Sequence, residues 1–70
     1  MSAVEIFGKP SCPYTQAARE DYANRGFKVI FYDVVADPLR LEEMLKLTPG
    51  KRRVPVICEN GQVTVGFGGT

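Results

Sequence analysis

Residues 9–15 read KPSCPYT, and the fold of this 70-residue chain is organised around them. An apolar run ends just before them at Phe7, and an amphipathic helical pattern begins inside them. Pro13 fits the first turn of a helix, because its fixed φ suits the helix and its missing N–H would have no partner there. We therefore expect Cys12 at or next to the N-cap of a helix that follows directly on a strand.

A cysteine at this position is expected to be reactive. The unpaired backbone N–H groups and the positive end of the helix dipole stabilise a thiolate, and Lys9 adds a positive charge three residues upstream. In such settings the pKa of a thiol falls to roughly 3.5–7.5, from about 8.5 when it is free. The alternative is a structural cysteine, since free cysteines are often buried. The nearby lysine and the prolines at Pro10 and Pro13 favour the reactive interpretation.

The composition indicates one small globular domain that spans residues 1–70. The chain is 44% hydrophobic and 24% charged, as ordinary globular proteins are. Its net charge of +1 gives no electrostatic basis for binding nucleic acid or an anionic membrane. The longest apolar run, residues 29–32, is far short of the roughly 20 residues that cross a membrane. A cytoplasmic location is the default expectation.

The cysteine and histidine content narrows the chemistry further. Two cysteines, Cys12 and Cys58, are too few for a disulfide scaffold and fit a reducing compartment. The chain has no histidine, which excludes Cys–His and Ser–His–Asp catalysis and removes the commonest transition-metal ligand. Cys58 alternates with Val54 and Val56 on one face of a predicted strand, so we expect it to pack without resolving a disulfide.

The remaining pattern predicts the order β-α-β-α-β-β. The expected strands are residues 3–7, 27–35, 54–58 and 63–65, and the expected helices are residues 13–25 and 38–48. A β-α-β unit implies a right-handed crossover and therefore parallel first and second strands. The predicted inner faces are Tyr14, Ala17, Ala18 and Tyr22 in the first helix and Leu41, Met44 and Leu45 in the second.

This arrangement resembles the glutaredoxins, an α/β family with the thioredoxin fold and a four-stranded mixed sheet. Four signatures carry the resemblance: Cys12-Pro13-Tyr14, Arg53-Val54-Pro55, the Asn60-Gly61 hairpin and Gly68-Gly69. Their order and spacing are those of the family, and they span nearly the whole chain. The short chain and its GFGGT ending are also similar to a small glutaredoxin-like group, some of whose members carry selenocysteine at the nucleophile position.

The resemblance implies a glutathione-binding site beside Cys12. A cis bond before Pro55 would turn the backbone of Val54 toward that cysteine, where it would pair with glutathione as a short added strand. An ordinary proline that opens an edge strand is the alternative. Lys9 and Arg52 match positions that hold the glycine carboxylate of glutathione, although each is otherwise a solvated charge. The full implied glutathione-binding set is Lys9, Tyr14, Arg52, Val54, Pro55, Gly68 and Gly69.

The sequence departs from the family pattern in three places. Thr15 stands where dithiol members have their second cysteine, and Arg53 replaces a threonine. The chain also stops where the family continues into a third helix that binds the γ-glutamyl group. We therefore expect a monothiol mechanism with Cys12 as nucleophile, in which Lys9 and Thr15 stabilise the thiolate.

The implied function is that of a glutathione-dependent thiol–disulfide oxidoreductase in electron transport and redox homeostasis. Glutathione would be the co-substrate, and glutathionylated or disulfide-bearing proteins would be the partners; no metal is expected. One alternative is an iron–sulfur cluster carrier, but such relatives have Cys-Gly-Phe-Ser, and Pro13 and Tyr14 would crowd a cluster. Another is a redoxin reduced by a different thiol system.

A missing third helix would leave part of the apolar sheet face uncovered. Phe67 is the only nearby residue able to fold back over it. Monomers seldom expose large contiguous apolar patches, and self-complementary patches often form two-fold dimers. The expectation is a homodimer, or otherwise a protein of marginal stability.

Overall fold

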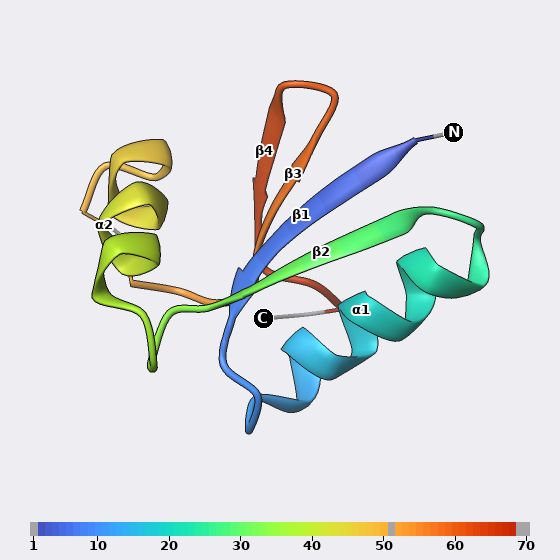
Figure 1. The fold of residues 1–70 in the computed structure, drawn as a ribbon, viewed down its shortest axis with the longest axis horizontal. Helices are drawn as coiled ribbons and strands as arrows, with labels where there is room; N and C mark the ends of the chain where they lie inside the picture. Colours follow the sequence, from blue (N-terminus) through green and yellow to red (C-terminus); the bar gives the residue numbers. More distant parts are fainter. Residues whose placement is uncertain (1, 51, 69–70) are drawn as a thin grey trace.

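The structure, a computed structural model, describes residues 2–50 and 52–68 and is built on one four-stranded sheet (Figure 1). Its elements, in chain order, are β1 (Ala3–Gly8), α1 (Pro13–Asn24), β2 (Lys28–Asp33), α2 (Pro38–Leu47), β3 (Val56–Glu59) and β4 (Gln62–Val65). This confirms the predicted order of strands and helices.

The sheet is mixed, as expected, with the strand order β2-β1-β3-β4. β1 runs parallel to β2, with Ile6 opposite Phe31, and antiparallel to β3, with Phe7 opposite Val56. β1 and β2 both end toward α2, which lies at that end of the sheet (Figure 1). Because β3 is antiparallel to β1, it begins beside the point where β1 ends, and the segments flanking these two ends are brought together.

Local chemistry sets most of the element boundaries. Cys12 is the N-cap of α1, with φ −82° and ψ 119°, and Pro13 opens the helix as predicted. Gly26, with φ +88°, stops the chain from continuing the helix, since this left-handed conformation suits glycine. At the start of α2, the Asp37 carboxylate accepts a hydrogen bond from Leu39 N at 3.1 Å.

Two strand boundaries differ from the prediction by two residues, and the others agree with it to within one residue. β2 ends at Asp33 rather than at residue 35, because the Asp33 carboxylate accepts hydrogen bonds from Val35 N (2.9 Å) and Ala36 N (3.0 Å) and turns the chain. β3 begins at Val56 rather than at residue 54, because Pro55 has no N–H to offer the strand ladder.

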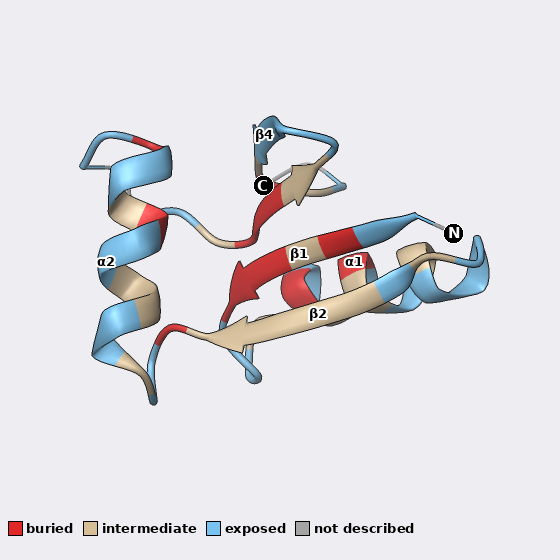
Figure 2. Ribbon diagram, turned by 45° about the horizontal axis from the view of Figure 1, so that its top comes forward, coloured by how far each residue is buried: buried red, intermediate tan, exposed pale blue. Residues whose placement is uncertain are grey.

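The core lies on both faces of the sheet, and β1 contributes to each (Figure 2). Alternation along the strand turns Val4 and Ile6 toward α1 and Phe7 toward α2. The cluster on the α1 side comprises Val4, Ile6, Ala18 and Ile57, with Tyr22, Phe27, Val29, Phe31 and Phe67 packed against it. The cluster on the α2 side comprises Phe7, Val34, Met44 and Val56, with Tyr32, Leu41, Leu45, Val54, Cys58 and Val65 packed against it.

The inner face of α1 differs in part from the predicted one: Ala18 and Tyr22 belong to the core on this side as expected, but Tyr14 and Ala17 do not. Thr15 and Ala18 are fully buried, whereas Ala17 is exposed and Tyr14 is 43% exposed. Thr15 packs closely against Gly8 at the end of β1, so α1 turns Thr15 and Ala18 toward the sheet in place of Tyr14 and Ala17. The prediction for α2 is confirmed, since Leu41, Met44 and Leu45 all belong to the core cluster on that side.

The expected uncovered apolar face on the α1 side is not found in residues 2–50 and 52–68. Ile57 is only 2% exposed, and Phe67 packs over this cluster as anticipated. On β4, Thr64 lies opposite Ile57 and is exposed, so this part of the face is polar. The described residues therefore cover this part of the apolar face themselves, and the homodimer stays a prediction.

Candidate active site

The loop between β1 and α1 is braced so that Cys12 keeps a fixed place at the start of the helix. Cys12 N donates to Lys9 O at 3.1 Å and closes a turn, and Cys12 O accepts from Gln16 N at 3.1 Å. The Gln16 side chain also reaches back to Pro10 O at 2.7 Å. Sequence reasoning did not find this role of Gln16. The result is a partly exposed thiol on a fixed backbone.

The surroundings of Cys12 lower the pKa of its thiol. The Thr15 hydroxyl contributes most, followed by the backbone N–H groups of Thr15 and Tyr14 and then by the charge of Lys9; partial burial opposes them. These groups belong to the helix start and its preceding turn, as the sequence predicted. The structure therefore brings Lys9, Tyr14 and Thr15 together around the nucleophile candidate.

The Thr15 hydroxyl is unusual because it is buried without a conventional partner. Thr15 is 0% exposed, and its Oγ1 has no hydrogen bond of ordinary geometry within the part of the chain that the structure describes. Its main influence is on the neighbouring Cys12 sulfur. A thiolate is a far better acceptor than a neutral thiol, so ionisation of Cys12 would favour a hydrogen bond from this hydroxyl.

The segment around Pro55 lies at the same end of the sheet. The predicted cis bond between Val54 and Pro55 is confirmed. Phe7 pairs with Val56, which sets this segment beside the end of β1, and Gly66 N donates to Pro55 O at 2.7 Å. Among the described residues, the backbone N–H and C=O of Val54 have no hydrogen-bond partner.

The other predicted binding residues are less closely tied to the thiol. Arg52 is exposed, and Gly68 is exposed with φ +63°. Gly69 lies outside the described residues. Within residues 2–50 and 52–68, no hydrogen bond or ion pair links Cys12 to Arg52, Val54 or Gly68.

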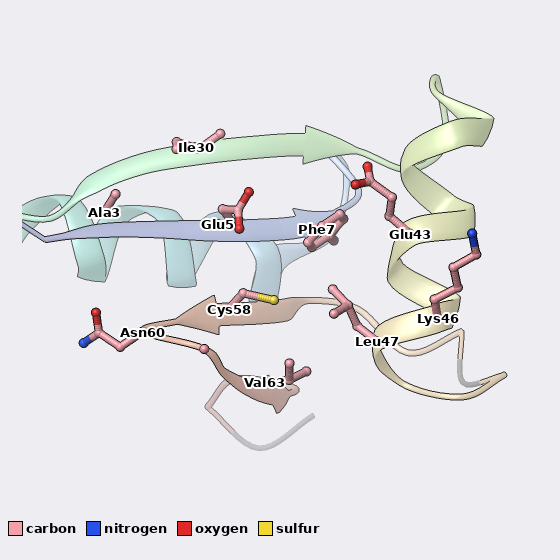
Figure 3. A pocket seen from close by; sticks show the side chains of 11 residues that line it. Ala3, Glu5, Phe7, Ile30, Glu43, Lys46, Leu47, Cys58, Asn60 and Val63 are labelled. Carbon is pink, nitrogen blue, oxygen red and sulfur yellow. The ribbon is translucent and has the colours of Figure 1, made fainter.

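Cys58 occupies a different environment on the opposite face of the sheet. It packs against the α2-side cluster, and burial, together with the charge of Glu5, raises the pKa of its thiol. It also lines a groove of about 570 Å³ (Figure 3). Side chains lining this groove include Glu5, Phe7, Ile30, Leu47 and Val63, and Cys12 is not among them. These observations support the prediction that Cys58 is a packing residue.

Residues 2–50 and 52–68 contain no group of three or more His, Cys, Asp or Glu side chains that could hold a metal ion. No helix in the described part of the chain has the length and apolar character needed to cross a membrane.

The fold is the thioredoxin fold, and a match to a family model supports a thiol oxidoreductase. The family model of glutaredoxin matches residues 4–64, so the chain belongs to the glutaredoxin family. A search of curated proteins finds no match.

Three solved structures illustrate the likeness. A glutaredoxin from Archaeoglobus fulgidus superimposes with a TM-score of 0.80 at 19% identity, covering 97% of this chain and 78% of its own. A buckwheat glutaredoxin–glutathione complex superimposes with a TM-score of 0.75 at 19% identity, and the match covers 93% of this chain and 61% of the buckwheat chain. A glutaredoxin from Brucella melitensis superimposes with a TM-score of 0.71 at 29% identity, and the match covers 94% of this chain and 71% of the Brucella chain.

Proposed function

We propose that this glutaredoxin is a glutathione-dependent thiol–disulfide oxidoreductase that works with Cys12 as its single redox thiol. The observation that carries the proposal is the pair of contrasting cysteines. Cys12 is partly exposed at a helix N-cap with its pKa lowered, whereas Cys58 packs on the other face of the sheet with its pKa raised. Only a thiolate attacks a disulfide, and the lowered pKa of Cys12 makes it the cysteine that ionises more readily.

The proposed cycle has two exchange steps. The Cys12 thiolate attacks the glutathione sulfur of a protein–glutathione mixed disulfide; a new S–S bond forms, the old one breaks, and the substrate leaves as a thiolate that takes up a proton. A glutathione thiolate then attacks the glutathione sulfur held on Cys12, which forms glutathione disulfide and releases the Cys12 thiolate. Two electrons thus pass from thiols to the substrate disulfide.

The residues around the thiol have separable proposed roles. The unpaired backbone of Val54 is suited to pair with the backbone of a bound glutathione. Lys9 and Arg52, both exposed, are proposed to hold its glycine carboxylate through charge-assisted hydrogen bonds. Tyr14, 43% exposed in the first turn of α1, is free to pack beside the tripeptide. Gly68 is proposed to complete the binding surface.

The test is turnover of a small glutathione mixed disulfide with glutathione as reductant. The Cys12→Ser variant should lose all activity, and Cys58→Ser, a matched removal of the other thiol, should keep most of it. Activity that needs both cysteines would replace the monothiol mechanism with a dithiol one. A native protein without activity, but with the visible absorption of an iron–sulfur cluster after anaerobic purification, would favour the carrier alternative.

A further inference from the structure

Gly8, the last residue of β1, is held firmly in the sheet. It lies opposite Asp33 in the parallel ladder, its C=O accepts a hydrogen bond from Val34 N at 3.1 Å, and it is buried. Its φ is not positive, so an L-residue could adopt its backbone conformation. Glycine is required here for another reason, which is space.

The space beside Gly8 is filled by the side chain of Thr15. A Cβ built on Gly8 would lie 2.5 Å from Thr15 Cγ2, 2.6 Å from Oγ1 and 3.1 Å from Cβ. Distances under 3.0 Å are essentially never seen for real Cβ atoms. A glycine in a strand often marks such a close approach of two segments.

Thr15 has no rotamer that relieves this clash. Cγ2 and Oγ1 now occupy the two staggered positions on Cβ that face Gly8. Only one other staggered position exists, so rotation about χ1 can move one of these atoms away but never both. Thr15 is fully buried, and its backbone lies in the first turn of α1. A methyl group on Gly8 would therefore displace the start of the helix, where Cys12 is the N-cap.

We propose that Gly8 is a positioning residue for the thiol chemistry: the bare backbone at the end of β1 seats the Thr15 side chain so that its buried, unpartnered hydroxyl serves the Cys12 sulfur. This inference rests on the proposed function, in which Cys12 is the redox thiol. It assigns part of the reactivity of Cys12 to Gly8, a residue that does not touch the thiol. The lowered pKa of Cys12, with Thr15 as its largest cause, agrees with the geometry.

The experiment measures the rate of Cys12 alkylation against pH in a Cys58→Ser background, so that one thiol reports. The variants are Gly8→Ala, Thr15→Ala and Gly8→Ala/Thr15→Ala, with Thr15→Ser as the conservative control and thermal unfolding as a check on the fold. When the midpoint of the alkylation–pH curve rises by one pH unit, the thiolate fraction at pH values below the midpoint falls about tenfold. We expect Gly8→Ala to slow alkylation near neutral pH by roughly threefold to tenfold, and Thr15→Ser to keep most of the native rate.

The double variant gives the decisive comparison. Thr15→Ala removes the hydroxyl and both γ atoms that would lie under 3.0 Å, and leaves only the Cβ at 3.1 Å. Adding Gly8→Ala to it should therefore change the midpoint and the unfolding temperature much less than Gly8→Ala changes them in the native protein. If Gly8→Ala alone does not fold, the double variant should regain the fold. A native midpoint in Gly8→Ala would overturn the inference, and so would a Gly8→Ala effect on the midpoint or the stability that is as large in the Thr15→Ala background as in the native one. A native protein that alkylates like a free thiol would instead refute the proposed function.

Discussion

Cys58 lies directly opposite Glu5 in the antiparallel pair of β1 and β3. Burial and this neighbouring carboxylate keep the Cys58 thiol protonated, since they raise its pKa, whereas the pKa of Cys12 is lowered. We therefore predict that a thiol reagent near neutral pH labels Cys12 first, and that Cys58 catches up only as the pH rises past the ordinary range for a thiol. Mass spectrometry of peptides checks this, and comparable early labelling of both cysteines would contradict it.

Lys9 and Arg52 are expected to act on glutathione through their charge. Lys9→Gln and Arg52→Gln should each raise the KM for a glutathione mixed disulfide roughly twofold to fivefold, because exposed charge pairs contribute about 0.2–1 kcal/mol. The increase should shrink at high salt, which screens such charges. Lys28→Gln is the matched control, since Lys28 is exposed at the opposite end of the sheet. Equal effects of all three substitutions would show that only net charge matters.

Phe67 covers the α1-side core and should carry part of the stability. Phe67→Ala is predicted to lower the free energy of unfolding by about 2 kcal/mol, which is less than for a fully buried phenylalanine because Phe67 is only partly buried. Val63→Ala, at a position 40% exposed, should cost much less. Denaturant unfolding of both variants measures the difference. A Phe67→Ala protein as stable as the native one would show that the core does not need this cover.

The Tyr32 hydroxyl donates to Glu5 Oε2 at 2.8 Å, and this bond, with burial and the Glu5 charge, raises the pKa of Tyr32. Tyr32→Phe should cost about 1 kcal/mol of unfolding free energy near neutral pH. Because the folded-state pKa lies above the ordinary value, this stabilisation is fully present below that value and is lost as the pH rises through the raised pKa. The native and Tyr32→Phe proteins should therefore converge in stability at alkaline pH. A difference that persists there would point to packing of the ring instead.

Much of the fold could be predicted because its signals are local. Pro13 after Cys12 and Asp37 before Pro38 announce the two helix starts, and Asn60 and Gly61 adopt the positive φ values, +50° and +79°, that a tight hairpin needs. The cis bond before Pro55 was predicted from the family resemblance rather than from local chemistry.

What could not be predicted depends on contacts between elements. The spacing of apolar residues in α1 favoured Tyr14 and Ala17 as inner residues. The helix instead turns Thr15 toward β1, where its side chain is fully buried. The sequence marks Gly8 only as a glycine at a strand end, and its contact with Thr15 exists only once α1 is docked on the sheet. The Gln16 brace on Pro10 likewise needs the folded loop.

In the proposed cycle, Cys12 accepts glutathione from a mixed disulfide, and a single-turnover experiment can detect this step. The native protein, fully reduced, is mixed near neutral pH with a glutathionylated peptide and quenched in acid, and the products are identified by mass. We expect one glutathione on Cys12, none on Cys58, and the peptide released with a free thiol. A peptide–protein adduct in place of the glutathione adduct, modification of Cys58, or an intramolecular disulfide between the two cysteines would contradict this expectation.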